Sequence, residues 1–316
     1  MKTSSVPNPI GAIEDINGSM KVGIAIPTYN EKQNLQPLVE RLINVFKKSN
    51  RKCHIVIVDD NSKDGTGDLA ESLSKQYHCL SVIHRPGKLG LGSAYKDAFH
   101  FLLKDPSVTV VMEMDADLSH EPEYIPRMLQ KIDEGYDVVV GSRYTEGGGI
   151  GKEWAPLRQL VSKSANFMTT LLIGLKVKDA TSGFRAYDAY ALKTIDMSKI
   201  RSNDYAFQID MLFHCRNAGC EIAETPIIFL ERKHGKSKLA GRAIMEFVKT
   251  LEHSFARRFC WTVENIAQCF SIWFANSLWI GLKPLRMAIK EANSLQTDGK
   301  NVYGRYTVAK FDKTSW

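Results

Sequence analysis

The chain has 316 residues, of which 44% are hydrophobic and 24% are charged, with 22 Gly and 11 Pro. These values exclude a collagen-like or wholly disordered chain and predict one large domain or two ordinary ones. The net charge is +7, and the excess lies in residues 231–316, which hold 15 Lys and Arg against 7 Asp and Glu. This segment is either a solvated basic tail or the binding site of an anionic partner: phosphate ligands, an acidic membrane surface or nucleic acid.

Neither a zinc site nor a secretory signal is indicated. The six cysteines include no CxxC pair and no spacing typical of structural zinc, so we expect free thiols in a reducing compartment. Residues 1–20 contain no long apolar run, and we expect a flexible N-terminal segment there rather than a signal peptide.

Apolar runs alternate with amphipathic segments over the first half of the chain. The runs at 22–28, 54–58, 80–84, 108–114 and 136–141 predict strands, and the segments between them carry apolar residues at helical spacing. This alternation predicts an α/β fold with a Rossmann-like, mainly parallel sheet and helices on both faces. Since ligands bind at the carboxyl ends of parallel strands, the polar residues after each run are the candidate site.

The second half of the chain has a looser pattern. We expect helices at 160–175 and 204–218, a polar turn at 178–185 and a strand at 221–230, all within the same domain. Residues 265–282 are uncharged, but five of them carry amides or hydroxyls, so a membrane-spanning helix is disfavoured. The Trp and Phe residues of this stretch, with Lys and Arg on both sides, fit either an interfacial membrane helix or an ordinary packing helix.

The strongest chemical signal is Asp115-Ala116-Asp117, which follows the predicted strand 108–114. A strand end there would direct both carboxylates toward the ligand site. Carboxylate oxygens are hard ligands, so Mg²⁺ or Mn²⁺ bridging to substrate phosphates would neutralise them. The alternative is a solvated turn.

Other polar segments suit a nucleotide and its phosphates. Asp59 and Asp60 can accept hydrogen bonds from a base or ribose, or cap the next helix, and Tyr29 can pack beside a base. The glycine-bearing loop at 85–92 is similar to a phosphate-approaching loop, without the Walker or dinucleotide pattern. The candidate phosphate-binding cations are Arg143, Arg158, Arg185, Arg232 and Lys238. The sequence has no GxSxG, HExxH or thiol-hydrolase motif, which disfavours a hydrolase.

Seven motifs, in order, resemble those of one enzyme family. They are PTYNE (27–31), VDDNSKDGT (58–66), LGLGSAY (89–95), MDADLSHEP (114–122), GSRY (141–144), TSGFRAY (181–187) and HGKSKLAG (234–241). Together they resemble the dolichol-phosphate mannose synthases, or polyprenol-phosphate mannosyltransferases, of glycosyltransferase family 2, which have the GT-A fold. The resemblance implies a GT-A catalytic domain over residues 21–257 and leaves residues 258–316 as a basic, aromatic-rich tail.

The resemblance implies inverting transfer of mannose from GDP-mannose to dolichyl or polyprenyl phosphate, for protein glycosylation or glycolipid assembly, with Mg²⁺ or Mn²⁺ as cofactor. It implies that Asp117 and Arg143 are catalytic and that Asp115 and Asp117 hold the metal. The implied donor-binding residues are Pro27, Tyr29, Glu31, Ile57, Asp59, Asp115, Ala116, Asp117, Arg143, Arg232 and Lys238. The implied acceptor-phosphate residues are Arg143, Arg158 and Ser162. Ser119 stands where some relatives place a Gln as third metal ligand, so here the metal would rely more on Asp117, substrate oxygens and water.

A lipid acceptor would explain the basic tail, because an aromatic stretch with flanking cations can hold an enzyme at a membrane surface. Some relatives use small membrane-anchoring subunits, which are a further expected partner. We expect the cytosolic face of the endoplasmic reticulum in a eukaryote, and the cytoplasmic face of the cell membrane otherwise. Two alternatives stay open: a polyprenyl-phosphate glucosyltransferase that uses UDP-glucose, and a basic nucleic-acid-binding module. Nucleic acid is disfavoured as a partner, because conspicuous acidic residues line the expected site.

Overall fold

Seven strands form one sheet in the computed structural model, which describes residues 21–151, 162–163, 166–167, 169–170, 174–200, 202–203 and 206–231. The first part contains β1 (Lys21–Thr28), α1 (Lys32–Ser49), β2 (Lys52–Asp59), α2 (Thr66–Gln76), β3 (Leu80–His84), α3 (Leu91–Leu102), β4 (Val108–Glu113), η1 (Pro122–Tyr124), α4 (Ile125–Asp133) and β5 (Val138–Ser142). The second part contains β6 (Gly149–Ile150), β7 (Arg185–Asp188), α6 (Ala189–Thr194), η2 (Met197–Lys199), α7 (Ala206–Asn217), β8 (Ile222–Pro226) and β9 (Ile228–Phe229).

The sheet is mainly parallel, as the alternation of strands and helices predicts. Its strand order is β3-β2-β1-β4-β7-β5-β8, and the pairs β1–β2, β1–β4, β2–β3 and β5–β8 are parallel. The exception is β7, which runs antiparallel to both β4 and β5 and was not expected from the sequence. Arg185, the first residue of β7, pairs with Glu113 of β4 and Val140 of β5. The loop before β7 therefore lies at the edge where β4 and β5 end.

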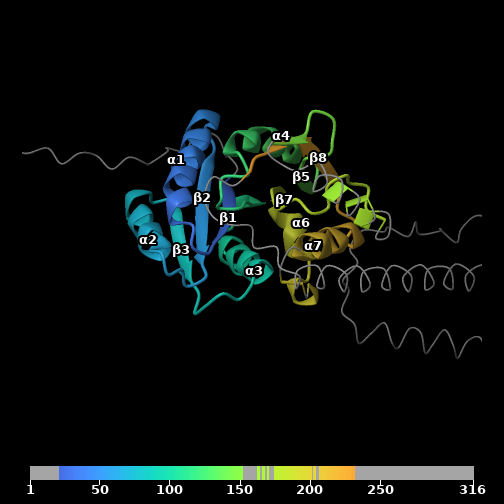
Figure 1. The fold of residues 1–316 in the computed structure, drawn as a ribbon. Helices are drawn as coiled ribbons and strands as arrows, with labels where there is room; N and C mark the ends of the chain where they lie inside the picture. The colour runs from blue at the N-terminus through green and yellow to red at the C-terminus, as the bar shows by residue number, and fades with distance from the viewer. Residues whose placement is uncertain are drawn as a thin grey trace, which may run out of the picture.

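Helices cover both faces of the sheet (Figure 1). α1, α2 and α4 pack on one face, in a core cluster that includes Ile24 and Ile26 of β1. α3, α6 and α7 pack on the other face, in a cluster that includes Ala25. Successive side chains of a strand point to opposite faces, so each central strand contributes to both cores. This is why the strands appear in the sequence as continuous apolar runs.

Several expectations fall on segments that the structure does not describe. They are the N-terminal segment 1–20, the domain end at 257, the tail 258–316 and its uncharged stretch 265–282. Of the helix expected at 160–175, the described residues 162–163, 166–167 and 169–170 are helical, and 174–175 are not. The cysteines in the described part of the chain, Cys53, Cys79, Cys215 and Cys220, are free, as their spacing predicts. None of the described helices is long and apolar enough to cross a membrane.

Candidate active site

The loops that follow β1 and β2 are joined into one wall by hydrogen bonds between side chains and main chain. The N–H of Asn30 donates to Ser62 Oγ at 2.9 Å, and the N–H of Lys63 donates to Asn30 Oδ1 at 2.9 Å. The N–H of Glu31 donates to Thr66 Oγ1, also at 2.9 Å. Asn30 has a φ of 57°, in the left-handed region that asparagine tolerates. We call these two joined loops, together with Pro27 at the end of β1, the nucleotide wall, after the nucleotide that the sequence predicts there.

Pro27, Tyr29 and Glu31 lie on the nucleotide wall, and each is partly exposed. Lys88 Nζ lies 5.1 Å from the centre of the Tyr29 ring, a distance typical of a cation–π contact. Glu31 Oε2 accepts a hydrogen bond from Asn34 Nδ2 at 2.7 Å, which ties it to the first turn of α1. Three of the expected donor-binding residues are therefore accessible at one edge of the sheet.

Asp59 and Ile57, near the end of β2, are buried. Asp59 is 3% exposed, and its Oδ1 accepts a hydrogen bond from Ser62 Oγ at 2.5 Å, so the carboxylate supports the nucleotide wall. The alternative that Asp59 and Asp60 cap the next helix is wrong, because the N-cap of α2 is Gly65. Ile57 is 0% exposed and packs among apolar side chains in the core, so its side chain does not reach the surface of the wall.

Arg85 holds the glycine loop (residues 86–90, before α3) against the end of β2. Arg85 is 5% exposed; its Nε donates to Asp60 Oδ1 at 2.5 Å, and its Nη2 donates to the carbonyl oxygen of Gly90 at 3.0 Å. Burial raises the pKa of Asp60 above its ordinary value, although Arg85 opposes this shift. The two residues are 25 positions apart, and their spacing gives no sign of this pair in the sequence.

Gly92 is required for close packing of α3 against the segment that leads into α7. A Cβ at Gly92 would lie 2.7 Å from Phe207 Cδ2 and 2.8 Å from the carbonyl oxygen of Ser202. The N–H of Gly92 donates to the carbonyl oxygen of Asn203 at 2.6 Å. The glycine at this position is therefore explained by its protein neighbours, without a phosphate.

Asp115 and Asp117 follow the end of β4, at the middle of the sheet edge. The Asp115 side chain is 32% exposed, whereas Asp117 and Ala116 are each 4% exposed. Asp117 Oδ1 accepts hydrogen bonds from the N–H of Ser119 at 3.0 Å and from Ser119 Oγ at 2.5 Å. Leu118, between them, has a φ of 64°, which is uncommon for a residue with a side chain. Ser119 therefore fixes the direction of the Asp117 carboxylate within a tight turn.

Asp115 also contacts Tyr95 and His120, which lie within two of the seven motifs but were not among the expected site residues. Tyr95 Oη donates to Asp115 Oδ1 at 3.3 Å, and the N–H of Asp115 donates to His120 Nδ1 at 3.2 Å. Burial lowers the pKa of His120 to about 4, so the ring is neutral near pH 7 and Nδ1 can accept this bond. Burial also raises the pKa of Tyr95 well above its ordinary value, so the hydroxyl keeps its proton.

The loop before β7 lies against Asp115. A Cβ on Gly183 would lie 3.7 Å from Asp115 Oδ1. The fully buried Arg185 shapes this loop, because its Nη2 donates to the carbonyl oxygen of Ala180 and its Nε to that of Ser182, both at 2.8 Å. The expectation that Arg185 binds phosphate is wrong, since its guanidinium is bound to main-chain oxygens inside the protein.

Arg143, which follows β5, forms a buried ion pair with Asp179. Its Nε donates to Asp179 Oδ2 and its Nη2 to Asp179 Oδ1, both at 2.7 Å. Nη2 also donates to Thr181 Oγ1 at 2.7 Å, and the Arg143 side chain is 9% exposed. Burial favours a higher pKa for Asp179, but the charge and hydrogen bonds of Arg143 outweigh it and hold that pKa below its ordinary value. Arg143 is therefore a charged group oriented by a carboxylate.

Ser162 is linked to Arg143 through neighbouring side chains. Tyr144 Oη and Ser162 Oγ are 2.7 Å apart. Asn166 Nδ2 donates to the carbonyl oxygen of Ser162 at 3.1 Å and to Thr181 Oγ1, which also binds Arg143, at 3.0 Å. These contacts bring two of the expected acceptor-phosphate residues into one network. The other expected cations, Arg158, Arg232 and Lys238, lie outside the described residues.

Comparison with known proteins identifies the family. A model described as Glycosyl transferase family 2 matches residues 23–196, more than half of the chain. The chain belongs to glycosyltransferase family 2. This glycosyltransferase is 40% identical over 240 residues to the polyprenol monophosphomannose synthase of Mycolicibacterium smegmatis, covering 75% of its own chain and 88% of that protein. It is 39% identical over 229 residues to the undecaprenyl-phosphate mannosyltransferase of Micrococcus luteus, covering 72% and 91% of the two chains.

Solved structures share the fold of the glycosyltransferase. The glucosyl-3-phosphoglycerate synthase of Mycobacterium tuberculosis, in complex with Mn²⁺, UDP-glucose and phosphoglyceric acid, matches with a TM-score of 0.51 and 17% identity over 76% of this chain and 80% of that chain. The same enzyme with Mg²⁺ and UDP matches with a TM-score of 0.53 and 18% identity over 76% and 80% of the two chains. The expected GT-A-like fold class is thereby confirmed.

The carboxylates Asp115 and Asp117 have the chemistry that a divalent cation requires. Among the residues the structure describes, no group of three His, Cys, Asp or Glu side chains could hold a metal ion by itself. Mg²⁺ is commonly bound in proteins by one or two carboxylates together with substrate phosphates. Asp115, partly exposed, and Asp117, oriented by Ser119, supply hard oxygen ligands of this kind.

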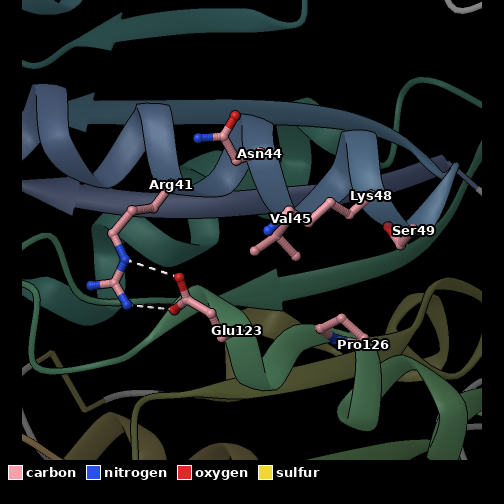
Figure 2. Close-up of a pocket in the computed structure, with 7 residues that line it drawn as sticks. All are labelled: Arg41, Asn44, Val45, Lys48, Ser49, Glu123 and Pro126. Carbon is pink, nitrogen blue, oxygen red and sulfur yellow. Dashed lines mark hydrogen bonds and ion pairs between the residues drawn. The ribbon is translucent and has the colours of Figure 1, made fainter.

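A groove of about 410 Å³ lies between α1 and the η1–α4 segment of the glycosyltransferase (Figure 2). It is lined by Arg41, Asn44, Val45, Lys48, Ser49, Glu123 and Pro126. Arg41 Nε donates to Glu123 Oε1 at 3.2 Å, so the guanidinium at the groove is already bound to a carboxylate. No candidate active-site residue lines this groove.

Proposed function

We propose that this glycosyltransferase transfers mannose from GDP-mannose to a polyprenyl phosphate, such as dolichyl phosphate, with inversion at the sugar carbon. The observation that carries the proposal is the carboxylate pair Asp115 and Asp117 after β4, in a chain 40% identical to a polyprenol monophosphomannose synthase. The names of the curated relatives support mannose over the glucose alternative, and a lipid phosphate as acceptor. They give no support to the nucleic-acid alternative.

In this proposal the nucleotide of the donor lies on the nucleotide wall. The exposed parts of Tyr29 and Glu31 contact the nucleoside, while Asp59 and Ile57 support the wall from below. The diphosphate lies at the carboxyl end of β4, next to Asp115 and Asp117. Arg232 and Lys238 complete the donor site, as the motif resemblance implies.

We assign Asp115 and Asp117 to a Mg²⁺ or Mn²⁺ ion that is shared with the donor diphosphate. When bound, such an ion neutralises the diphosphate and stabilises the charge that develops on departing GDP. The Asp117 carboxylate is oriented for the ion in advance, because Ser119 holds it in one direction. Gly183 allows close approach to Asp115, since a larger side chain there would fill the space beside Oδ1.

The acceptor needs no strong general base. A phosphate monoester has its second pKa at about 6, so an acceptor oxygen is ionised near neutral pH. Arg143, Arg158 and Ser162 are proposed to position that phosphate. Asp179 binds two nitrogens of Arg143 and so fixes the guanidinium before the acceptor arrives, which reduces the entropy cost of alignment. One displacement from the opposite face then inverts the sugar carbon without an enzyme nucleophile.

The proposed acceptor is a membrane lipid, so the reaction would take place at a membrane surface. The excess of basic residues over 231–316 supports binding to anionic lipids or to small membrane-anchoring subunits. In a eukaryote this surface would be the cytosolic face of the endoplasmic reticulum, and otherwise the cytoplasmic face of the cell membrane.

The test compares two donors in liposomes that contain polyprenyl phosphate. GDP-mannose should give a mannosylated lipid, UDP-glucose should give none, and a chelator of divalent cations should stop the reaction until metal is restored. Glucolipid formed as readily as mannolipid would refute the donor assignment. Activity that survives complete removal of divalent cations would refute the metal assignment.

The variant Asp117→Ala tests the metal assignment at the level of a single residue. We expect transfer to fall by about 100-fold or more, because the variant loses a group that stabilises charge in the transition state. The control is Asp188→Ala, which removes a partly exposed carboxylate at the end of β7 farther from the site. Asp188 accepts hydrogen bonds from the N–H groups of Tyr190 and Ala191. The control should keep wild-type activity despite a comparable loss of hydrogen bonds.

A further inference from the structure

The contacts of Asp115 include one from its own loop and one from a helix. The N–H of Asp115 donates to His120 Nδ1 at 3.2 Å, a contact within the same loop. Tyr95 Oη donates to Asp115 Oδ1 at 3.3 Å, and Tyr95 lies on α3, 20 residues earlier in the chain. A side chain of α3 therefore influences where the Asp115 carboxylate lies.

The ring of Tyr95 is held in place by its neighbours. Tyr95 is 0% exposed, and its ring stacks on Phe207 and Phe99, with centroid distances of 5.9 and 6.1 Å and interplanar angles of 13° and 29°. Core side chains at native packing density cannot change rotamer without displacing the residues around them. The hydroxyl of Tyr95 is therefore a fixed donor directed at Asp115 Oδ1.

We propose that Tyr95 is a positioning residue for the metal and diphosphate site: its hydroxyl fixes the side-chain rotamer of Asp115 so that the carboxylate can bind the divalent cation. This inference deepens the proposed function and rests on the metal role assigned to Asp115. Hydrogen bonds from neighbouring groups orient ligating carboxylates, and loss of such a partner typically weakens metal binding by about 10–100-fold. Asp117 receives its support from Ser119 inside one turn, whereas Asp115 receives it across the core.

Tyr187 provides a matched control. It is 1% exposed, its ring lies 5.9 Å from that of Phe99, and its Oη donates to Glu113 Oε1 at 2.8 Å. Glu113 precedes Asp115 by two residues but is 0% exposed in the core. Tyr187→Phe therefore removes a buried hydroxyl-to-carboxylate bond of the same kind, and the bond from Tyr95 Oη to Asp115 Oδ1 stays in place.

The experiment measures Mn²⁺ binding to the full chain in the presence of GDP, by electron paramagnetic resonance of free Mn²⁺, for the wild type, Tyr95→Phe and Tyr187→Phe. We expect Tyr95→Phe to weaken Mn²⁺ binding by about tenfold or more, and to raise the Mn²⁺ concentration for half-maximal transfer by the same factor. Its kcat at saturating Mn²⁺ should stay close to the wild-type value. Tyr187→Phe should bind Mn²⁺ as the wild type does.

Circular dichroism at the assay temperature gives the folded fraction of each variant. A second variant, Phe207→Leu, keeps the Tyr95 hydroxyl but removes one stacked ring, and should weaken Mn²⁺ binding in the same direction by a smaller factor. Wild-type Mn²⁺ binding in Tyr95→Phe, or an equal loss in Tyr95→Phe and Tyr187→Phe, would overturn the positioning role.

The same experiment distinguishes failure of the proposed function from failure of the positioning role of Tyr95. If the wild-type chain binds Mn²⁺ but transfers no mannose, the donor and acceptor assignment falls, while the effect of Tyr95→Phe on Mn²⁺ binding still decides the positioning role. If the wild-type chain binds no Mn²⁺ with GDP present, the metal role of Asp115 is overturned and the role of Tyr95 with it.

Discussion

The ion pair between Arg143 and Asp179 leads to a quantitative prediction for Asp179→Asn. The Asp179 side chain is 0% exposed and that of Arg143 is 9% exposed, so the pair is shielded from water. Asp179 Oδ2 accepts both the N–H of Arg143, at 3.0 Å, and its Nε–H, at 2.7 Å. In asparagine, an NH₂ group replaces one of the two carboxylate oxygens. If it replaces Oδ2, it faces the N–H and Nε–H of Arg143, and if it replaces Oδ1, it faces Nη2. The variant therefore loses the charge and gains a donor–donor contact.

Removing one partner of a buried ion pair costs about 3–5 kcal/mol. Because Asp179 accepts three hydrogen bonds from Arg143, we expect the free energy of unfolding to fall by about 4 kcal/mol, near the middle of that range. This is a large share of the roughly 5–15 kcal/mol that stabilises an ordinary domain. Replacing both partners by apolar residues is much less damaging. The double variant Arg143→Met/Asp179→Leu should therefore be more stable than Asp179→Asn.

Urea unfolding followed by circular dichroism, with a double-mutant cycle, measures these values. The pH dependence has a definite sign, because Arg143 holds the pKa of Asp179 below its ordinary value in the folded protein. The stabilising effect of Asp179 should be fully present above the unfolded pKa of about 3.9, and should be lost as the pH falls through the lower folded pKa. A loss below about 1 kcal/mol for Asp179→Asn at pH 7 would place this pair with weak surface ion pairs and refute the reasoning.

Two further predictions concern the packing of α3 and the anchor of the glycine loop. Gly92→Ala should lower the free energy of unfolding by about 1–3 kcal/mol, because its Cβ would lie 2.7 Å from Phe207 Cδ2. Gly87→Ala, in the glycine loop, has no atom within 4 Å of its Cβ and should leave urea unfolding unchanged. Equal losses in the two variants would contradict the packing explanation. Arg85→Met should cost about 3–5 kcal/mol, since it leaves the buried Asp60 without its cation. Hydrogen exchange of the loop amides should also become faster, and unchanged exchange would mean that Arg85 does not hold the loop.

The sequence predicts the strands well where apolar runs are long. The strand expected at 80–84 coincides with β3, and the strands expected at 22–28 and 108–114 differ from β1 and β4 by one residue at an end. β7 was missed because it has four residues, Arg185–Asp188, and two of them are charged. Its strand conformation depends on β4 and β5 on either side, which bring partners from distant parts of the chain. Local sequence patterns do not indicate which distant strands will pair with a short segment.

The same limit applies to the candidate site. The position of Asp115 and Asp117 at the sheet edge follows from their place after an apolar run, and the structure has them there. Arg185 was misassigned, because a sequence does not distinguish an arginine bound to buried carbonyl oxygens from one that awaits a phosphate. The pairing of Arg143 with Asp179 joins residues 36 positions apart, and no motif spacing indicates it.

The antiparallel direction of β7 has a consequence for how this enzyme could be altered. The N–H of Gly141, in β5, donates to the carbonyl oxygen of Phe184 at 2.8 Å, so the chain leaves the sheet after Ser142 and returns beside the same point. The proposed acceptor residues Arg143, Arg158 and Ser162 all belong to this excursion, whereas Tyr29, Glu31 and Asp59 do not. An excursion that begins and ends at adjacent positions can be exchanged as a cassette between related enzymes. Under the proposed function, the acceptor site could then be altered by exchanging one segment, while Tyr29, Glu31 and Asp59 on the nucleoside side stay unchanged.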